Sequence, residues 1–101
     1  MTTNTLVTIT YSVAPAKRME LESILRDLVQ RINGAQQGVR MSVYQEEDDP
    51  NSFVEVYECD SADAYDSLED NLDDDTRRQI SRIATDFAQA RQSVVSLKRV
   101  A

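Results

Sequence analysis

The order of two hydrophobic periodicities along 101 residues is the feature that most limits how this chain folds. Apolar residues that alternate with polar ones, many of them β-branched, are typical of strands. This alternation predicts strands over residues 6–13, 39–44, 53–59 and 93–100. The segments between them either repeat every three to four residues, as helices do, or are short and polar.

Two of the connections are predicted to be helical. The first runs from Pro15 to 33–34, about five turns, and ends at an Asn-Gly pair. The second is divided into a short helix after the capping residues 60–61 and a longer helix that starts at the aspartates 73–75. The apolar stripe of this longer helix consists of Ile80, Ile83, Ala84, Phe87 and Ala88.

The resulting order is strand, helix, strand, strand, helix pair, strand, which is the split β-α-β arrangement of ferredoxin-like α+β folds. We expect one domain over 1–101, with an antiparallel four-stranded sheet and the helices on one face. The polar segment 34–38 is predicted to be a turn. The acidic segment 46–51 is predicted to be a hairpin loop between the second and third strands.

Alternation within each strand assigns its residues to two faces. The face expected under the helices holds Val7, Ile9, Tyr11, Val13, Val39, Met41, Val43, Val54, Val56, Val95 and Leu97. The other face holds Leu6, Thr8, Thr10, Ser12, Arg40, Ser42, Tyr44, Phe53, Glu55, Tyr57, Val94, Ser96, Lys98 and Val100. This second face is too apolar to be left wholly to water, so we predict a homodimer in which two sheets pack face to face. A solvated face is the alternative.

The composition excludes several classes of function. Histidine and tryptophan are absent, which rules out Ser-His-Asp and Cys-His catalysis and histidine-ligated metals or haem. A single cysteine, Cys59, forms no intrachain disulfide, which fits a reducing, cytoplasmic compartment. Residues 2–10 lack the pattern of a secretion signal, and no segment has the roughly 20 apolar residues of a membrane span.

Three features carry a resemblance to a known family: the opening strand LVTITYSVAP, the segment FVEVYECDSADAYDSL, and the divided second crossover. Together they resemble the dimeric α/β-barrel superfamily, and in particular its antibiotic-biosynthesis-monooxygenase branch. Ser61, Ala64 and Tyr65 match the family's capping serine and Ala-aromatic pair. Cys59 stands where a strand-end tryptophan is common, and Leu68 where a pocket tryptophan or histidine is common.

The resemblance implies a substrate site between the helices and the sheet, with no metal or organic cofactor. The residues expected to line it are Tyr11, Met41, Tyr65, Leu68, Ile83 and Phe87. Such a lining suits a small apolar or aromatic molecule, positioned by the hydroxyls of Tyr11 and Tyr65. The implied reaction is oxidation of an aromatic or polyketide-like substrate by O₂. The alternatives are a filled core and a non-catalytic dimeric module for ligand binding, stress response or assembly, which Leu68 favours because leucine offers no polar group.

Other candidate sites are weaker. The acidic clusters 46–49 and 73–75 lack the spacing of a calcium loop, and carboxylates at 73–75 also suit a helix start. Glu55 is a candidate general base, although Arg40 or Lys98 on the same predicted face would pair with it. Cys59, just before a helix, is a candidate thiolate with a lowered pKa.

Nucleic acids and membranes are not expected as partners. Tyr44, Phe53 and Tyr57 on an open sheet are similar to a base-stacking surface. A net charge of −7, however, repels phosphates and acidic lipids.

Overall fold

Four antiparallel strands form one sheet in the order β2-β3-β1-β4. The computed structural model describes residues 3–35, 37–89 and 92–101. Residue 2 of the segment examined for a secretion signal, and Gln36 of the predicted turn, lie outside these ranges. The elements are β1 (Thr5–Ser12), η1 (Pro15–Lys17), α1 (Arg18–Ala35), β2 (Val39–Gln45), β3 (Ser52–Cys59), α2 (Ala62–Asp66), α3 (Leu68–Asn71), α4 (Asp74–Arg82), η2 (Ile83–Phe87) and β4 (Ser93–Lys98).

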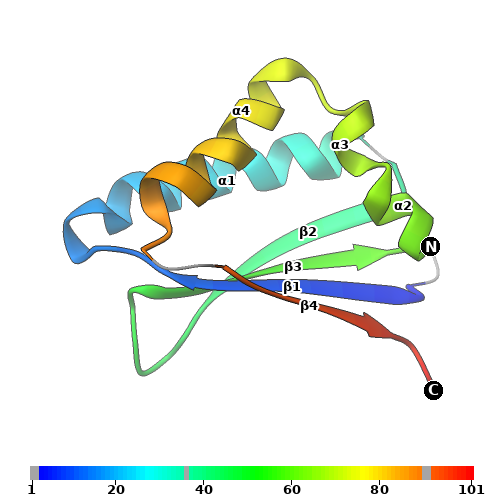
Figure 1. Ribbon diagram of the computed structural model, residues 1–101, viewed down its shortest axis with the longest axis horizontal. Helices are drawn as coiled ribbons and strands as arrows, with labels where there is room; N and C mark the ends of the chain where they lie inside the picture. Colours follow the sequence, from blue (N-terminus) through cyan, green and yellow to red (C-terminus); the bar gives the residue numbers. More distant parts are fainter. Residues whose placement is uncertain (1–2, 36, 90–91) are drawn as a thin grey trace.

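The described helices all lie on one face of this sheet, and the other face is bare (Figure 1). The predicted α+β, ferredoxin-like order of elements is therefore confirmed. The long first helix is a short 3-10 turn followed by α1, and the first part of the second crossover is two short helices, α2 and α3.

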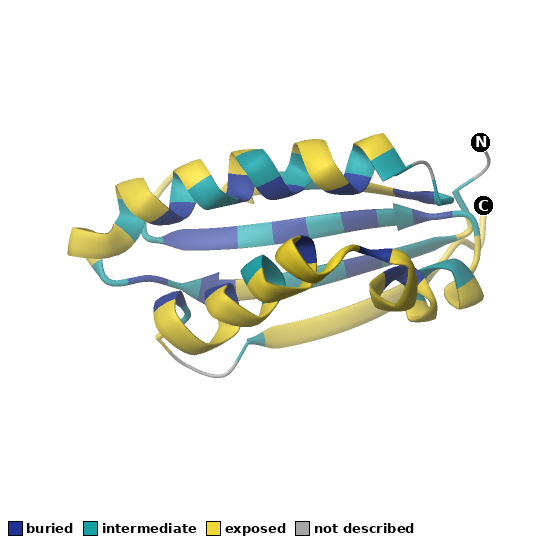
Figure 2. Ribbon diagram, turned by 90° about the horizontal axis from the view of Figure 1, so that it is seen from above, coloured by how far each residue is buried: buried dark blue, intermediate teal, exposed yellow. Residues whose placement is uncertain are grey.

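Helix α1 packs on the sheet through one apolar stripe. Leu21, Leu25, Leu28 and Ile32 recur at steps of three and four and are all buried, which leaves the outer side of the helix exposed (Figure 2). The Asn33 side chain accepts from Met41 N at 2.7 Å and donates to Met41 O at 3.1 Å. This pair of bonds ties the end of α1 to the edge strand β2.

Side-chain caps define the starts of the second-crossover helices. Ser61 Oγ accepts from Ala64 N at 3.2 Å, and Asp73 Oδ1 accepts from Thr76 N at 2.7 Å. After α4 the helix widens into the π turn η2, which is closed by Ala88 N donating to Ile83 O at 2.9 Å. Helix α4 and the turn η2 therefore cross the same face of the sheet as α1 and lie beside it (Figure 2).

The predicted faces of β3 were wrong. Strand β3 pairs with β1 in the register Val7 with Tyr57, Ile9 with Glu55 and Tyr11 with Phe53. Directly opposite residues share a face, so Phe53, Glu55 and Tyr57 lie under the helices and are buried. Val54 and Val56 face the other way. Both parities of this strand contain apolar residues, so alternation alone does not indicate which of them faces the core.

The faces of β4 were also assigned the wrong way round. Val94 pairs with Ile9 and therefore lies on the helix side, together with Ser96 and Lys98. Val95 and Leu97 lie on the open face, opposite Thr8 and Leu6. The strand is exposed along its whole length, with Val94 60% exposed, because no described helix covers this edge of the sheet (Figure 2).

The open face remains apolar, but different residues make it so. Tyr44 and Leu97 are 62% and 48% exposed. We use "open-face patch" for the apolar side chains gathered there: Leu6, Tyr44, Val54, Val56, Val95 and Leu97.

Candidate functional site

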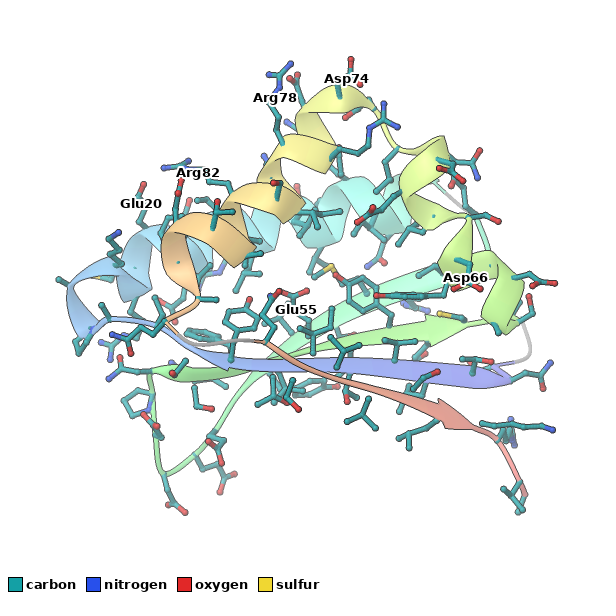
Figure 3. All side chains as sticks on the ribbon, viewed as in Figure 1. Glu20, Glu55, Asp66, Asp74, Arg78 and Arg82 are labelled. Carbon is teal, nitrogen blue, oxygen red and sulfur yellow. The ribbon has the colours of Figure 1, made fainter. Side chains whose placement is uncertain are left out.

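A buried carboxylate, Glu55, lies between the sheet and the helices (Figure 3). It is the glutamate of β3 that faces the core, and it is only 4% exposed. Tyr11 donates its hydroxyl proton to Glu55 Oε2 at 2.6 Å, and Tyr57 donates to Oε1 at 2.8 Å. Both carboxylate oxygens therefore accept a phenol hydrogen bond, which offsets part of the cost of burying them.

Burial governs the protonation of this group. Desolvation raises the pKa of the Glu55 carboxyl, and the hydrogen bonds from Tyr11 and Tyr57 partly oppose that rise. The pKa values of both phenols are raised, first by burial and then by the charge of Glu55. The tyrosines therefore stay protonated and act as donors, while Glu55 is the group of the three that can accept a proton.

A cavity of about 600 Å³ lies beside Glu55, between the sheet and the second crossover. Its apolar wall is made of Ile9, Leu28, Leu68, Ile80, Ile83 and Ala84. Its polar groups are Glu55, Tyr57, Tyr65, Asp66, Glu69, Arg77, Ser81 and Gln92. A volume of this size accepts a small organic molecule.

Two aromatic rings form one corner of this cavity. Tyr57 of β3 and Tyr65 of α2 pack edge to face, with ring centroids 5.5 Å apart and an interplanar angle of 72°. Arg77 of α4 also lines the cavity, and its guanidinium contacts the Asp74 carboxylate and donates to Glu69 O. The only guanidinium among the described lining residues is thus already bonded to other groups of its own crossover.

The six residues predicted to line the site lie in two places. Tyr65, Leu68 and Ile83 line the cavity. Tyr11, Met41 and Phe87 do not: all three are buried in the core, where Tyr11 reaches Glu55 and Phe87 lies under the cations of Lys17 and Arg82. The contact between Lys17 and Phe87 links the start of the first crossover to the end of the second.

Sequence reasoning missed Tyr57 and gave Glu55 the wrong surroundings. Glu55 was expected to meet Arg40 or Lys98, but Arg40 lies on the open face opposite Glu58. The signal that was available is the placement of one carboxylate between Phe53 and Tyr57, two large aromatics of the same parity. Alternation places these three side chains on one face of the strand, so the face that buries the two aromatics here also buries Glu55.

Cys59 is not an activated thiol. It is completely buried at the end of β3, and desolvation raises its pKa, with the charge of Asp60 adding to the rise. The lowered pKa considered from its position before a helix is therefore wrong, because burial outweighs the helix terminus.

Within the parts of the chain that the structure describes, no group of three or more acidic or cysteine side chains is arranged to hold a metal ion. None of the helices described has the length and apolarity needed to cross a bilayer.

Comparisons with known proteins show a shared fold. No model of a protein family matches this chain, and no curated protein does. Among solved structures, a protein described as an antibiotic biosynthesis monooxygenase has a TM-score of 0.82 at 18% identity, over 96% of this chain and 99% of that one. A putative antibiotic biosynthesis monooxygenase from Nitrosomonas europaea has a TM-score of 0.82 at 14% identity, over the same shares.

A third structure, of a Pseudomonas aeruginosa protein, has a TM-score of 0.80 at 22% identity, over 100% of this chain and 98% of that one. These likenesses extend over whole chains at low identity. They show that this chain has the fold of antibiotic-biosynthesis-monooxygenase-like proteins, as its sequence indicated.

Proposed function

We propose that this protein binds a small apolar or aromatic molecule in the cavity beside Glu55 and oxidises it with O₂ without a cofactor. The observation that carries the proposal is a buried carboxylate at the wall of a cavity that also has an apolar wall and two tyrosine rings. Tyr65, Leu68 and Ile83 are the proposed ligand contacts. Tyr11 is a proposed positioning residue: it does not line the cavity, but its hydroxyl donates to Glu55 Oε2.

Glu55 has the properties of a general base. A carboxylate with a raised pKa accepts a proton from a weakly acidic hydroxyl more readily than an ordinary one does. For a hydroxylated aromatic such as 1-naphthol, loss of the hydroxyl proton to Glu55 makes the ring electron-rich enough to reduce O₂. One oxygen atom then forms the new carbonyl of 1,4-naphthoquinone, and the other leaves as water with the two hydrogens lost by the substrate.

The likeness to solved structures supports this reaction class. Several neighbours with the same fold are described as antibiotic biosynthesis monooxygenases or putative ones. The buried Glu55 supplies a proton acceptor in a chain that contains no histidine.

Filling the cavity tests where the ligand lies. Ala84 lines the cavity and is exposed, so Ala84→Trp adds an indole there with little disturbance of the core. Thr85→Trp is the matched control, since Thr85 is the next residue of the same turn, is exposed and does not line the cavity.

With 1-naphthol as the probe and amide chemical shifts as the readout, Ala84→Trp should weaken binding about tenfold or more, which corresponds to about 1.4 kcal/mol. Thr85→Trp should bind as the wild type does. Equal affinities in both variants would mean that the molecule binds elsewhere.

A non-catalytic ligand-binding module is the second candidate, and Leu68 favours it. Leu68 lies in the cavity wall where the resemblance implies a tryptophan or histidine, and it offers no hydrogen bond to a substrate. Oxygen consumption with 1-naphthol separates the two functions. Oxygen uptake that is lost in Glu55→Gln supports the monooxygenase, whereas binding of 1-naphthol without oxygen uptake in the wild type supports the ligand-binding module.

We also propose that two copies pack through the open-face patch. Its apolar side chains lie together on all four strands of the sheet, on the face that none of the described helices covers (Figure 1). Burying such a patch against a second sheet gives a self-complementary interface. The free thiol of Cys59 suits a reducing compartment, so we place this dimer in the cytoplasm.

A further inference from the structure

We propose that the molecule that fills the cavity is a cation: an apolar or aromatic body that carries an alkylated or protonated amine, with the nitrogen held at Glu55 and against the rings of Tyr57 and Tyr65. This inference relies on the proposed location of the ligand in the cavity. It does not depend on the oxidation step.

The charges around the cavity favour a positive ligand. Among the lining residues that the structure describes, three carboxylates, those of Glu55, Asp66 and Glu69, stand against the one guanidinium of Arg77. That guanidinium lies against Asp74, which reduces the field it adds to the cavity. Carboxylates at the walls of a low-dielectric pocket attract cations and repel carboxylate or phosphate ligands.

Of the three carboxylates, Glu55 should attract a cation most strongly because it is buried. Asp66 and Glu69 are exposed and screened by water, whereas Glu55 is 4% exposed. Its hydrogen-bond partners, Tyr11 and Tyr57, are neutral phenols that reduce the cost of a buried negative charge but do not cancel it. A ligand ammonium does cancel it, so part of the binding free energy comes from the relief of this cost.

The aromatic corner adds a second attraction. Ammonium groups bind to the faces of tyrosine rings, and alkylated ammonium ions do so well because they shed water easily. Tyr57 and Tyr65 present two rings at 72° to each other, one of which hydrogen-bonds to Glu55. Two rings set at an angle beside a carboxylate have the chemistry of an aromatic cage.

This ligand charge also serves the proposed reaction. Burial raises the pKa of Glu55, which enlarges the fraction of the group that already carries a proton and so cannot accept one. A neighbouring ammonium favours the carboxylate, so binding of a cationic substrate shifts Glu55 toward the deprotonated form that acts as a base.

Three compounds that share a benzyl group and differ in charge test the inference: benzyltrimethylammonium, benzyl alcohol and phenylacetate. Affinities are measured by amide chemical-shift titration of the whole protein. We expect the cation to bind at least about tenfold more tightly than the alcohol, and phenylacetate to bind most weakly. In Glu55→Gln the preference for the cation should fall to about twofold or less, while the alcohol binds as before.

Glu58→Gln is the matched control for net charge. Glu58 lies on the same strand but faces away from the cavity, opposite Leu6 and Arg40. Its removal changes the protein's charge by the same amount as Glu55→Gln, so a preference that survives Glu58→Gln comes from the site. An equal loss of preference in both variants would overturn the inference, since long-range charge would then explain it.

Tyr65→Leu provides a second variant that keeps the cavity wall apolar and leaves Glu55 in place. It should reduce binding of the cation several-fold while binding of benzyl alcohol changes little, and exposed Tyr44→Leu on the open face should change neither. If the alcohol and phenylacetate bind at least as well as the cation, the inference is wrong and the proposed cavity site stands. If none of the three binds, the inference is wrong, and the 1-naphthol titration decides separately whether the cavity is a ligand site.

Discussion

Tyr11 and Glu55 meet diagonally across β1 and β3, with the phenol oxygen 2.6 Å from Oε2 of the carboxylate. Glu55 lies directly opposite Ile9, two residues before Tyr11, so the contact spans neighbouring rungs of the sheet. Tyr57 takes the other oxygen from its own strand. This geometry keeps a polar group in the core and holds its carboxylate at the cavity wall.

Tyr11→Phe removes one of the two donors to Glu55. The unpartnered Oε2 should raise the pKa of the carboxyl further and lower the free energy of unfolding at neutral pH by about 1–3 kcal/mol. Carbon-detected titration of the Glu55 carboxyl and chemical denaturation measure the two effects. Tyr44→Phe, at an exposed phenol, should change neither quantity, and an unchanged Glu55 pKa in Tyr11→Phe would contradict the assigned hydrogen bond.

The stability contributed by Glu55 should depend on pH with a defined sign. Its folded pKa is raised, so between the ordinary glutamate pKa of about 4.3 and the folded value the native state binds more protons than the unfolded state. The wild type should therefore lose stability relative to Glu55→Gln as the pH rises through this window. The opposite trend, with wild type gaining on the variant, would mean that the carboxylate is stabilised in the fold.

Asp27, Asp73 and Asp74 change the stability in the opposite direction, because hydrogen bonds lower their pKa values in the folded protein. Their contribution to stability is lost as the pH falls. Their contribution is common to wild type and Glu55→Gln. The difference between the two denaturation curves at each pH therefore isolates Glu55.

Cys59 should react with thiol reagents only when the protein opens. Its side chain is completely buried and its thiol pKa is raised, so both access and thiolate are lacking in the native state. Ellman's reagent should label the native protein slowly and the denatured protein at once. Rapid labelling without denaturant would show that the end of β3 is more open than described.

The open-face patch should hold a dimer. Leu97→Glu places a charge in the patch, whereas Met19→Glu places one at an exposed position of α1. Light scattering at micromolar concentration should give twice the 11.4 kDa chain mass for the wild type and Met19→Glu, and the chain mass for Leu97→Glu. A monomeric wild type would refute the dimer.

The order of elements could be predicted because each element carries its own period. Steps of three and four in α1 and of two in β1 place Leu28 and Val7 in the core without knowledge of the partner. Helix starts were also readable, since Ser61 and Asp73 are capping residues and cap as expected.

The candidate site was predicted less well because it depends on which strand face meets the helices. Strand β3 offers Val54 and Val56 on one side and Phe53 and Tyr57 on the other, and only the register with β1 decides between them. The prediction that the valines face the helices placed Glu55 on the opposite face, away from Tyr11, so the hydrogen bond between them was not foreseen. A cavity wall and a filled core have the same apolar sequence pattern. The sequence therefore could not show that Ile83 lines the cavity whereas Met41 packs in the core.

Intermolecular NOEs from bound 1-naphthol test most directly whether this cavity is a ligand site. We predict NOEs from the naphthalene protons to the Tyr65 ring and to the methyl groups of Leu68 and Ile83, and their loss in Ala84→Trp. NOEs confined to Val56 and Leu97 of the open-face patch would place the molecule on the wrong side of the sheet and contradict the account.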